Sequence, residues 1–331
     1  MPRPSRRIVT LLLFSVATCA ALTGCGIVGG ASATSTPTLT ATATPTLTPT
    51  LTPTFTPSPT PSATSTPAPP ATPEVEMSQG RTAVLHVGNG GASGATAVFR
   101  GRTYTLVPDS TGFWVPIGVG ATVKPGDYVA TVTLTDASGG VIQTENLLVR
   151  VDPTNFPSEN VDVATSGPNG LQPPDQVQKE LEIRASIYAK ESPVKLWSGP
   201  FIIPAPGPIT TAFGTARSYN GGPISEHHSG TDIGAAEGTP VVAANAGRVV
   251  FVGMLTTRGN SVIIDHGLGV FTAYHHLSAF SVTEGQVVQK GQTIGAVGMT
   301  GLATGPHLHW ELVVGGQNVD PVYWTFEGVA P

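Results

Sequence analysis

The chain has 331 residues, which is long enough for two domains, but charged residues make up only 11% of it. An average soluble domain carries roughly 25%. The deficit lies largely in a charge-free tract near the N-terminus that lacks the composition of a globular domain. The formal net charge is -5, and no run of Lys and Arg forms a patch able to follow a phosphate backbone, so nucleic acid is excluded as an expected partner.

Residues 1–25 have the pattern of an export signal. Three arginines precede an apolar stretch, residues 8–22, which is short for a membrane span and typical of the core of a signal peptide. The stretch ends in Leu-Thr-Gly-Cys25, which resembles the lipobox of bacterial lipoproteins, where the cysteine receives lipid. We therefore expect lipid on Cys25 to anchor the exported protein to the outer face of the cytoplasmic membrane. An ordinary signal peptide with a coincidental cysteine is the alternative.

Cysteine usage limits the chemistry that the mature chain can perform. Cys19 lies inside the apolar stretch, and Cys25 is the only other cysteine. A mature chain would therefore have no thiol available for a disulfide, a nucleophile or a metal ligand. Any catalysis must use nitrogen and oxygen groups.

Residues 26–76 consist mostly of Thr, Pro, Ser and Ala in short repeats. The segment has no apolar period from which a core could form, and its dense proline favours extended polyproline II geometry. We expect a disordered spacer. If extended at about 3.1 Å per residue, roughly 40 such residues would reach on the order of 100 Å.

Residues 77–153 change to short strands separated by turns that contain Gly and Pro. The clearest strand is residues 128–135, where Tyr128, Ala130, Val132 and Leu134 share one face and threonines occupy most of the other. Several such strands in about 75 residues predict a small immunoglobulin-like β-sandwich. The fold class is therefore mainly β.

Residues 154–196 are expected to be a connector. Residues 155–174 have no strand or helix pattern and are interpreted as a loop, while Asp175 is a plausible cap for a helix that continues to about Lys190. The helix would carry its apolar residues at spacings that only partly match one face. A Ser-Pro pair at Pro193 would end it.

Residues 197–331 again alternate short strands with glycines. The expected strands are residues 241–244, 248–252, 261–265, 270–274, 286–289, 293–297 and 308–314. Glycines at their boundaries favour antiparallel hairpins. We expect a compact antiparallel β domain with a groove, and seven of the eight histidines of the chain fall in it.

Spacing separates the histidines that could act chemically from those that could not. His228 and Asp232 are four residues apart, and His307 and His309 share one face of a strand because side chains alternate along it. Nitrogen and carboxylate ligands of this kind suit a catalytic zinc with an open coordination position. His276 lies in a third motif between these two.

The remaining histidines are interpreted as bystanders. His227 and His275 each neighbour a candidate residue on extended chain and should point elsewhere. His266 lies in a turn and is expected to be structural, and His86 stands alone in a strand of the N-terminal β domain.

Three motifs in order resemble those of one enzyme family. They are His228-x-x-x-Asp232, Tyr-x-His276-Leu and the segment Gly-Pro-His-Leu-His-Trp-Glu of residues 305–311. Together they resemble the lysostaphin-type zinc peptidases, metallopeptidase family 23, which are peptidoglycan endopeptidases. The similarity extends over about residues 208–320.

The resemblance implies a role for each matching residue. It implies that His228, Asp232 and His309 bind one zinc ion per chain, and that His276 and His307 are the catalytic imidazoles. Three protein ligands leave a fourth coordination position for water, whose pKa zinc lowers to about 7. Neutral histidines can then move protons between water and the leaving amine.

Two further residues are weaker candidates. Tyr219 lies just upstream of the first motif, where a phenol could assist a developing oxyanion, although a packed or exposed loop tyrosine is the alternative. Glu311 follows His309 on the same strand face and could orient that imidazole, although a solvated carboxylate at a strand end is equally consistent with its position.

The expected function is an exported zinc endopeptidase that cuts stem peptides or cross-links of peptidoglycan. The alternative is a catalytically silent regulator that binds the cell wall and activates other wall hydrolases. The complete set of candidate ligands and imidazoles favours the enzyme. The expected partners are peptidoglycan and, through the lipid on Cys25, a membrane; the protein is expected to be a monomer.

Overall fold

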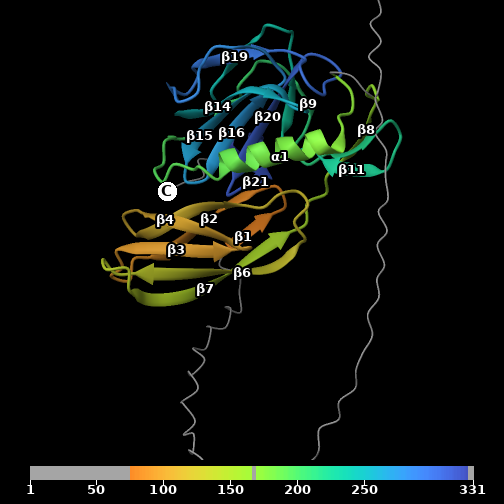
Figure 1. Ribbon diagram of the computed structural model, residues 1–331. Coiled ribbons are helices and arrows are strands. Elements are labelled where there is room, and N and C mark those ends of the chain that lie inside the picture. Colours follow the sequence, from red (N-terminus) through yellow and green to blue (C-terminus); the bar gives the residue numbers. More distant parts are fainter. Residues whose placement is uncertain (1–74, 166–168, 327–331) are drawn as a thin grey trace, which may run out of the picture. The chain divides into compact units, whose positions relative to one another are not determined.

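The computed structural model describes residues 75–165 and 169–326 (Figure 1). The expectations for the signal peptide, for Cys25 and for nearly all of the spacer concern residues outside these ranges. Within the described residues, no helix has both the length and the apolar character needed to cross a membrane.

The N-terminal β domain consists of seven strands. They are β1 (Val75–Ser78), β2 (Thr82–Gly88), β3 (Gly94–Phe99), β4 (Arg102–Pro108), β5 (Gly112–Gly118), β6 (Gly126–Thr135) and β7 (Val141–Asp152). Their hydrogen-bonded order is β1-β7-β6-β3-β4-β5-β2, with β1 and β7 parallel and the other pairs antiparallel. Strands β1 and β2, at the two ends of this order, both contribute buried residues to one core. The sheet therefore folds over into two layers around that core.

The alternation expected in β6 is present. Ala130, Val132 and Leu134 are buried in that core, while the threonines between them are partly exposed. The sequence therefore predicted the inward face of this strand correctly. The mainly β fold class is confirmed.

The C-terminal domain is built from many short antiparallel strands. They are β9 (Ile209–Thr211), β10 (Ala216–Tyr219), β11 (Ile224–His227), β12 (Thr231–Gly234), β13 (Pro240–Val242), β14 (Gly247–Leu255), β15 (Gly259–Gly267), β16 (Val270–His275), β17 (Leu277–Phe280), β18 (Val287–Val288), β19 (Thr293–Val297), β20 (His307–Val314) and β21 (Gln317–Val319), followed by the 3-10 helix η1 (Val322–Thr325). Each expected strand has an observed counterpart. The strands that sequence analysis did not predict are short.

One sheet of this domain carries the candidate site. Its strand order is β18-β14-β15-β16-β20-β12-β9, with β21 added on β20, and a smaller sheet has the order β13-β19-β17. Strand β20 lies between β16 and β12. One of its faces is apolar, and the other carries two histidines and a glutamate. Leu308, Trp310, Leu312 and Val314 are buried in the main apolar core, whereas the odd-numbered residues 307–313 belong to the opposite face.

The connector contains a strand that was not expected. Residues 155–174 were interpreted as a loop, but β8 (Ser158–Val161) pairs in parallel with β10, and β11, β10 and β8 form a third small sheet. The loop interpretation is wrong for these four residues because their strand character comes from pairing with β10, more than 50 residues away, rather than from an apolar pattern of their own.

Helix α1 (Pro174–Tyr188) confirms the expected helix, with two differences. Asp175 does not cap it: the position before the helix is Pro173, and Asp175 lies in the first turn, where its charge still favours the helix dipole. The buried face is also polar, since its buried residues are Glu180, Arg184 and Tyr188. In Figure 1 the helix lies across the strands of the C-terminal domain.

His266 is structural, as expected. It is fully buried on β15, where its Nδ1 atom lies 2.7 Å from the carbonyl oxygen of Ala246 and its Nε2 atom lies 2.7 Å from Oγ1 of Thr272. Burial lowers the pKa of His266 from 6.5 to about 4. The unfolded chain therefore binds a proton at this residue at a higher pH than the folded protein does.

We expect this imidazole to make the free energy of unfolding depend on pH. The contribution is fully present above pH 6.5 and is lost as the pH falls through about 4, at about 1.4 kcal/mol per pH unit. Urea unfolding of the wild type and of His266→Gln at several pH values between these limits tests this. The substitution should reduce the slope of the unfolding free energy against pH by that amount, and equal slopes would contradict the assignment.

Candidate active site

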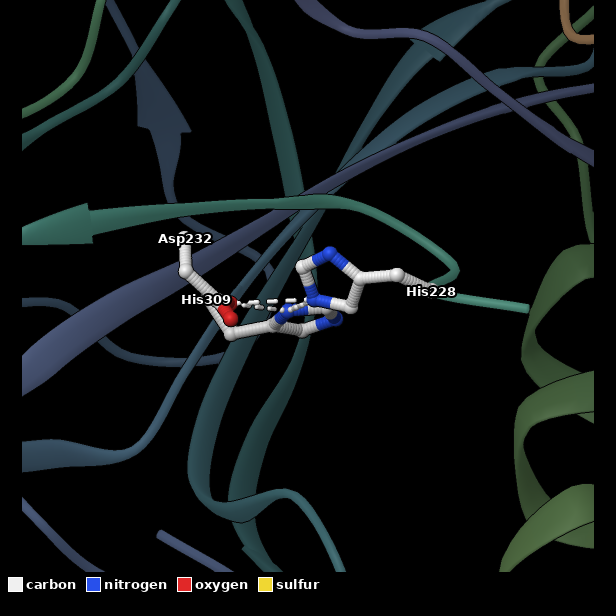
Figure 2. Close-up of side chains that lie close together, drawn as sticks. All are labelled: His228, Asp232 and His309. Atoms are coloured by element: carbon white, nitrogen blue, oxygen red, sulfur yellow. Dashed lines mark hydrogen bonds and ion pairs between the residues drawn. The ribbon is translucent and has the colours of Figure 1, made fainter. Parts of the chain in front are cut away.

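Three potential metal ligands converge at the end of β12. Asp232 on β12 lies directly opposite His309 on the antiparallel strand β20, and His228 lies in the loop that leads into β12. Figure 2 shows the three side chains pointing toward one another. One potential ligand atom from each lies within 4.8 Å of the others, and all three residues are buried.

The hydrogen bonds of His228 fix which nitrogen faces this cluster. Its Nδ1 atom lies 3.1 Å from the carbonyl oxygen of Ala212, which can only accept, so Nδ1 carries the proton. Its Nε2 atom then presents a lone pair, 3.1 Å from Oδ1 of Asp232 and 2.9 Å from Nδ1 of His309. Burial lowers the pKa of His228, which favours the neutral form that a metal needs.

His309 is oriented in the same way by a carboxylate. Its Nε2 atom lies 3.0 Å from Oε1 of Glu311, and its Nδ1 atom lies 2.8 Å from Oδ1 of Asp232. Burial alone would raise the pKa of Glu311, but the charges of Arg184 and Arg258 hold it well below its usual range. Ionised Glu311 accepts a hydrogen bond from the Nε2–H group of His309, so Nδ1 offers its lone pair to the cluster.

Asp232 completes a donor set that fits a divalent metal. Burial alone would raise its pKa, but its contacts with His228 and His309 hold the pKa well below the usual value. Its second oxygen, Oδ2, accepts a hydrogen bond from Arg217 at 2.8 Å. Two imidazole lone pairs and one carboxylate oxygen therefore face one point, which is the ligand chemistry that zinc accepts.

His276 and His307 form a pair beside the cluster. Their ring centroids are 4.7 Å apart, and Nε2 of His307 lies 3.7 Å from Oδ1 of Asp232. Each donates from Nδ1 to a carbonyl oxygen, His276 to Thr300 at 2.7 Å and His307 to Gly305 at 2.8 Å. Both therefore keep Nε2 free to accept a proton.

The backbone at His276 explains how this side chain leaves the strand. Strand β16 ends at His275, and His276 has a φ of 60°, in the left-handed region that residues other than glycine seldom adopt. Its amide donates to the carbonyl oxygen of Arg258 at 2.9 Å, which holds this conformation. Burial lowers the pKa of His276 well below its usual value, and the neighbouring His307 adds to the effect.

Neither of the histidines that neighbour a candidate residue is a potential ligand, although His275 lies against the site instead of pointing away from it. His227 packs edge-on against Phe156, with ring centroids 6.2 Å apart. His275 is fully buried and stacks on His309 at 5.6 Å, and its Nδ1 atom lies 2.7 Å from Oγ of Ser261. Neither belongs to the group of three potential ligands.

The two weaker candidates have different surroundings. The hydroxyl of Tyr219 donates to the carboxylate of Glu226, and both side chains line the groove that contains the cluster. Glu311 is fully buried and contacts His309, so it is not a solvated carboxylate at a strand end. The role of Tyr219 in the reaction stays a prediction.

A groove of about 710 Å³ gives access to these residues. One wall comes from the C-terminal domain and includes His276, His307 and Asp232. The connector supplies part of the lining, from β8 and from α1, including Arg184. The sequence did not identify these lining residues of the connector, because no local pattern links them to motifs that lie far along the chain.

Three arginines near the cluster were also missed. Arg184 and Arg258 both donate to Glu311, and Arg217 bridges Asp232 and Glu159. Isolated arginines carry no spacing signal, so only their positions in the folded protein reveal these contacts.

Comparisons with known proteins identify the segment that carries the site. Peptidase family M23 matches residues 226–321. Over 95 residues the chain is 52% identical to the DD-carboxypeptidase/endopeptidase Mpg of Neisseria meningitidis serogroup B. This alignment covers 29% of this chain and 22% of that protein. Over 93 residues it is 47% identical to the peptidoglycan DD-endopeptidase ShyA of Vibrio cholerae; this alignment covers 28% of this chain and 22% of that protein. The chain thus spans less than a quarter of the length of these curated relatives.

A similarity between structures extends further along the chain. A crystal structure from Pseudomonas aeruginosa, assigned as a peptidase M23, has a TM-score of 0.57 and 26% sequence identity. The match covers 75% of this chain and 95% of that one. Because 75% of the chain is much more than residues 226–321, the shared fold includes elements outside the segment that family M23 matches.

We expect Glu311→Gln to destabilise the protein strongly. The glutamine has nearly the same shape but no charge, so it would leave the buried Arg184 guanidinium without its counter-ion. Breaking a buried ion pair in this way costs about 3–5 kcal/mol, measurable as the free energy of unfolding in urea. Glu226→Gln changes an exposed carboxylate and is the matched control, expected to stay within about 0.5 kcal/mol. Equal effects of the two substitutions would contradict this account.

Proposed function

We propose that this chain, whose residues 226–321 match peptidase family M23, is a zinc-dependent endopeptidase that hydrolyses peptide bonds of peptidoglycan. The observation that carries the proposal is the convergence of His228, Asp232 and His309 beside two imidazoles whose Nε2 atoms are free. This combination provides a metal site and proton carriers in one groove.

In this proposal His228 Nε2, Asp232 Oδ1 and His309 Nδ1 hold one zinc ion. When bound, zinc supplies Lewis-acid chemistry, since it lowers the pKa of water and polarises a carbonyl group. The protein holds the two ligand imidazoles in the required tautomers through Ala212 and Glu311. The site therefore needs little rearrangement to accept a metal.

His276 and His307 are the proposed proton carriers. Because Nδ1 of each is held by a carbonyl oxygen, Nε2 can take a proton from the attacking water and later give it to the leaving amine. Burial lowers the pKa of His276, so this imidazole is neutral at neutral pH and its Nε2 lone pair is unprotonated. A protonated imidazole can also stabilise the negative charge that develops on the carbonyl oxygen.

The proposed substrate follows from the relatives and from the groove. The name of the Neisseria protein describes a DD-carboxypeptidase/endopeptidase, and that of the Vibrio protein describes a peptidoglycan DD-endopeptidase. We extend this to the present chain and propose that it cuts peptide cross-links between D-amino acids. The groove beside the imidazoles, of about 710 Å³, suits an extended peptide.

Zinc content and hydrolysis of purified peptidoglycan test the roles of the histidines. The wild type should hold about one zinc and release peptide ends. His309→Ala should lose the metal, whereas His307→Ala should keep it while the rate falls by roughly 10² to 10⁴. His86→Ala, on β2 in the N-terminal β domain, is the control and should change neither measurement.

Two outcomes would contradict the proposal. A wild type that binds no zinc would remove its basis. A wild type that binds zinc but releases no peptide ends would favour the silent regulator of other wall hydrolases over the enzyme.

We propose further that the protein acts outside the cytoplasm, anchored to the cytoplasmic membrane by lipid on Cys25. The support is the short apolar stretch with preceding arginines and the sequence Leu-Thr-Gly-Cys25 that ends it. Two acyl chains on one cysteine would give the stable anchoring that a single chain does not. The monomeric state is part of the same proposal.

Cys25→Ser should release the protein from the membrane, because serine cannot form the thioether to lipid. Partition between detergent and aqueous phases after expression in a bacterium measures this: the wild type should enter the detergent phase and the variant should not. Cys19→Ser is the matched control, since Cys19 lies within the apolar stretch. Equal partition of the wild type and Cys25→Ser would exclude the anchor.

A further inference from the structure

Helix α1 turns charged residues toward the protein interior. Its buried residues Glu180, Arg184 and Tyr188 follow one another at intervals of four, so they lie on one face. By contrast Leu181 and Ile183 are 50% and 45% exposed. Burying charged groups costs free energy unless they are paired, so this face must meet specific partners.

Arg184 meets the carboxylate that orients His309. The guanidinium donates to Oε2 of Glu311, and both side chains are almost fully buried. Burial on its own lowers the pKa of Arg184, but the charge of Glu311 reverses the effect and raises it, so the guanidinium stays charged. The two residues are 127 positions apart, and Arg184 lies outside residues 226–321.

The two oxygens of Glu311 have separate partners. Oε2 accepts from Arg184 and, at 3.0 Å, from Asn318. Oε1 accepts from His309 at 3.0 Å, Ser229 at 2.7 Å and Arg258 at 3.1 Å. Arg184 is the charged donor at Oε2 and Asn318 the neutral one, so without Arg184 only the weaker of the two contacts would hold this oxygen and, with it, the plane of the carboxylate.

We propose that Arg184 is a positioning residue of the metal site: by holding Oε2 of Glu311 it keeps Oε1 against Nε2 of His309, which aims Nδ1 of His309 at the metal. The connector helix thereby becomes part of the catalytic unit. The inference rests on the metal site proposed above but not on the substrate.

A simpler role for Arg184 would be to attach α1 to the domain. The helix has separate contacts for that purpose. Glu180 accepts a hydrogen bond from the backbone amide of Thr257, and the ring of Tyr188 packs on Phe271 with centroids 5.2 Å apart. Glu180 and Arg184 therefore form a matched pair of buried charged residues, one turn apart on the same face, of which only Arg184 contacts Glu311.

The dissociation constant for zinc, measured on the full chain by competition with a chromophoric chelator, distinguishes the two roles. Arg184→Ala should raise this constant by about tenfold. Substituting a residue that supports a metal ligand through a hydrogen bond typically weakens metal binding by about 10- to 100-fold, and Arg184 acts one residue further out. Arg184→Lys should restore most of the affinity, since an ammonium group can still donate to Oε2. The visible spectrum of the cobalt-substituted protein should change in Arg184→Ala and return toward that of the wild type in Arg184→Lys.

Glu180→Ala is the control for helix attachment, and Ile183→Ala is the control for an exposed position on α1. Glu180→Ala should lower the melting temperature but leave the zinc dissociation constant within twofold, and Ile183→Ala should leave both unchanged. If Arg184→Ala does not fold, Arg184→Met replaces it, because methionine keeps an unbranched side chain without a donor.

The proposal is overturned if a folded Arg184 variant without a donor binds zinc within twofold of the wild type. It is equally overturned if Glu180→Ala weakens zinc binding as much as Arg184→Ala, because the effect would then come from helix attachment. These results differ from failure of the proposed function, in which the wild type binds no zinc or binds it without cutting peptidoglycan.

Discussion

The buried carboxylate of Glu311 is the group on which the arrangement of the site depends. A negative charge with no exposure to solvent must be balanced by donors, and here they come from α1, the loop before β12, the β14–β15 turn, β20 and β21. Each donor connects its own segment of the chain to the Glu311 carboxylate. The carboxylate therefore links the connector to the candidate metal ligands, and its environment keeps it ionised.

Strand β20 contributes to both the core and the candidate site because successive side chains point to opposite faces of the strand. Leu308, Trp310 and Leu312 fill the core, while His309 and Glu311 face the candidate site. A shift of one residue in the pairing with β12 and β16 would exchange the two faces, placing imidazoles in the apolar core and the indole of Trp310 among the charged groups of the site. Packing of the apolar face thus fixes the register of β20, and this register places His309 opposite Asp232.

The orientation of the imidazoles comes mostly from backbone carbonyl oxygens. The carbonyl oxygens of Ala212, Thr300 and Gly305 accept hydrogen bonds from Nδ1 of His228, His276 and His307 respectively, so Nε2 of each presents its lone pair. Carbonyl groups in a folded loop move little, which holds the imidazoles ready before any metal or substrate binds. The unusual φ of His276 is one cost of this arrangement.

Patterns in the sequence predicted the mainly β class, the strands of the C-terminal domain, the helix of the connector, and the candidate residues His228, Asp232, His276, His307 and His309. The strands and the helix follow from alternation and turn residues, which are local properties of the chain, and the candidate residues follow from their spacing together with the resemblance to metallopeptidase family 23. The folded protein was needed to reveal which face of α1 is buried, that residues 158–161 form a strand, and that Arg184 reaches Glu311. Those features depend on partners more than 50 residues away, and a buried ion pair leaves no periodic pattern in either segment.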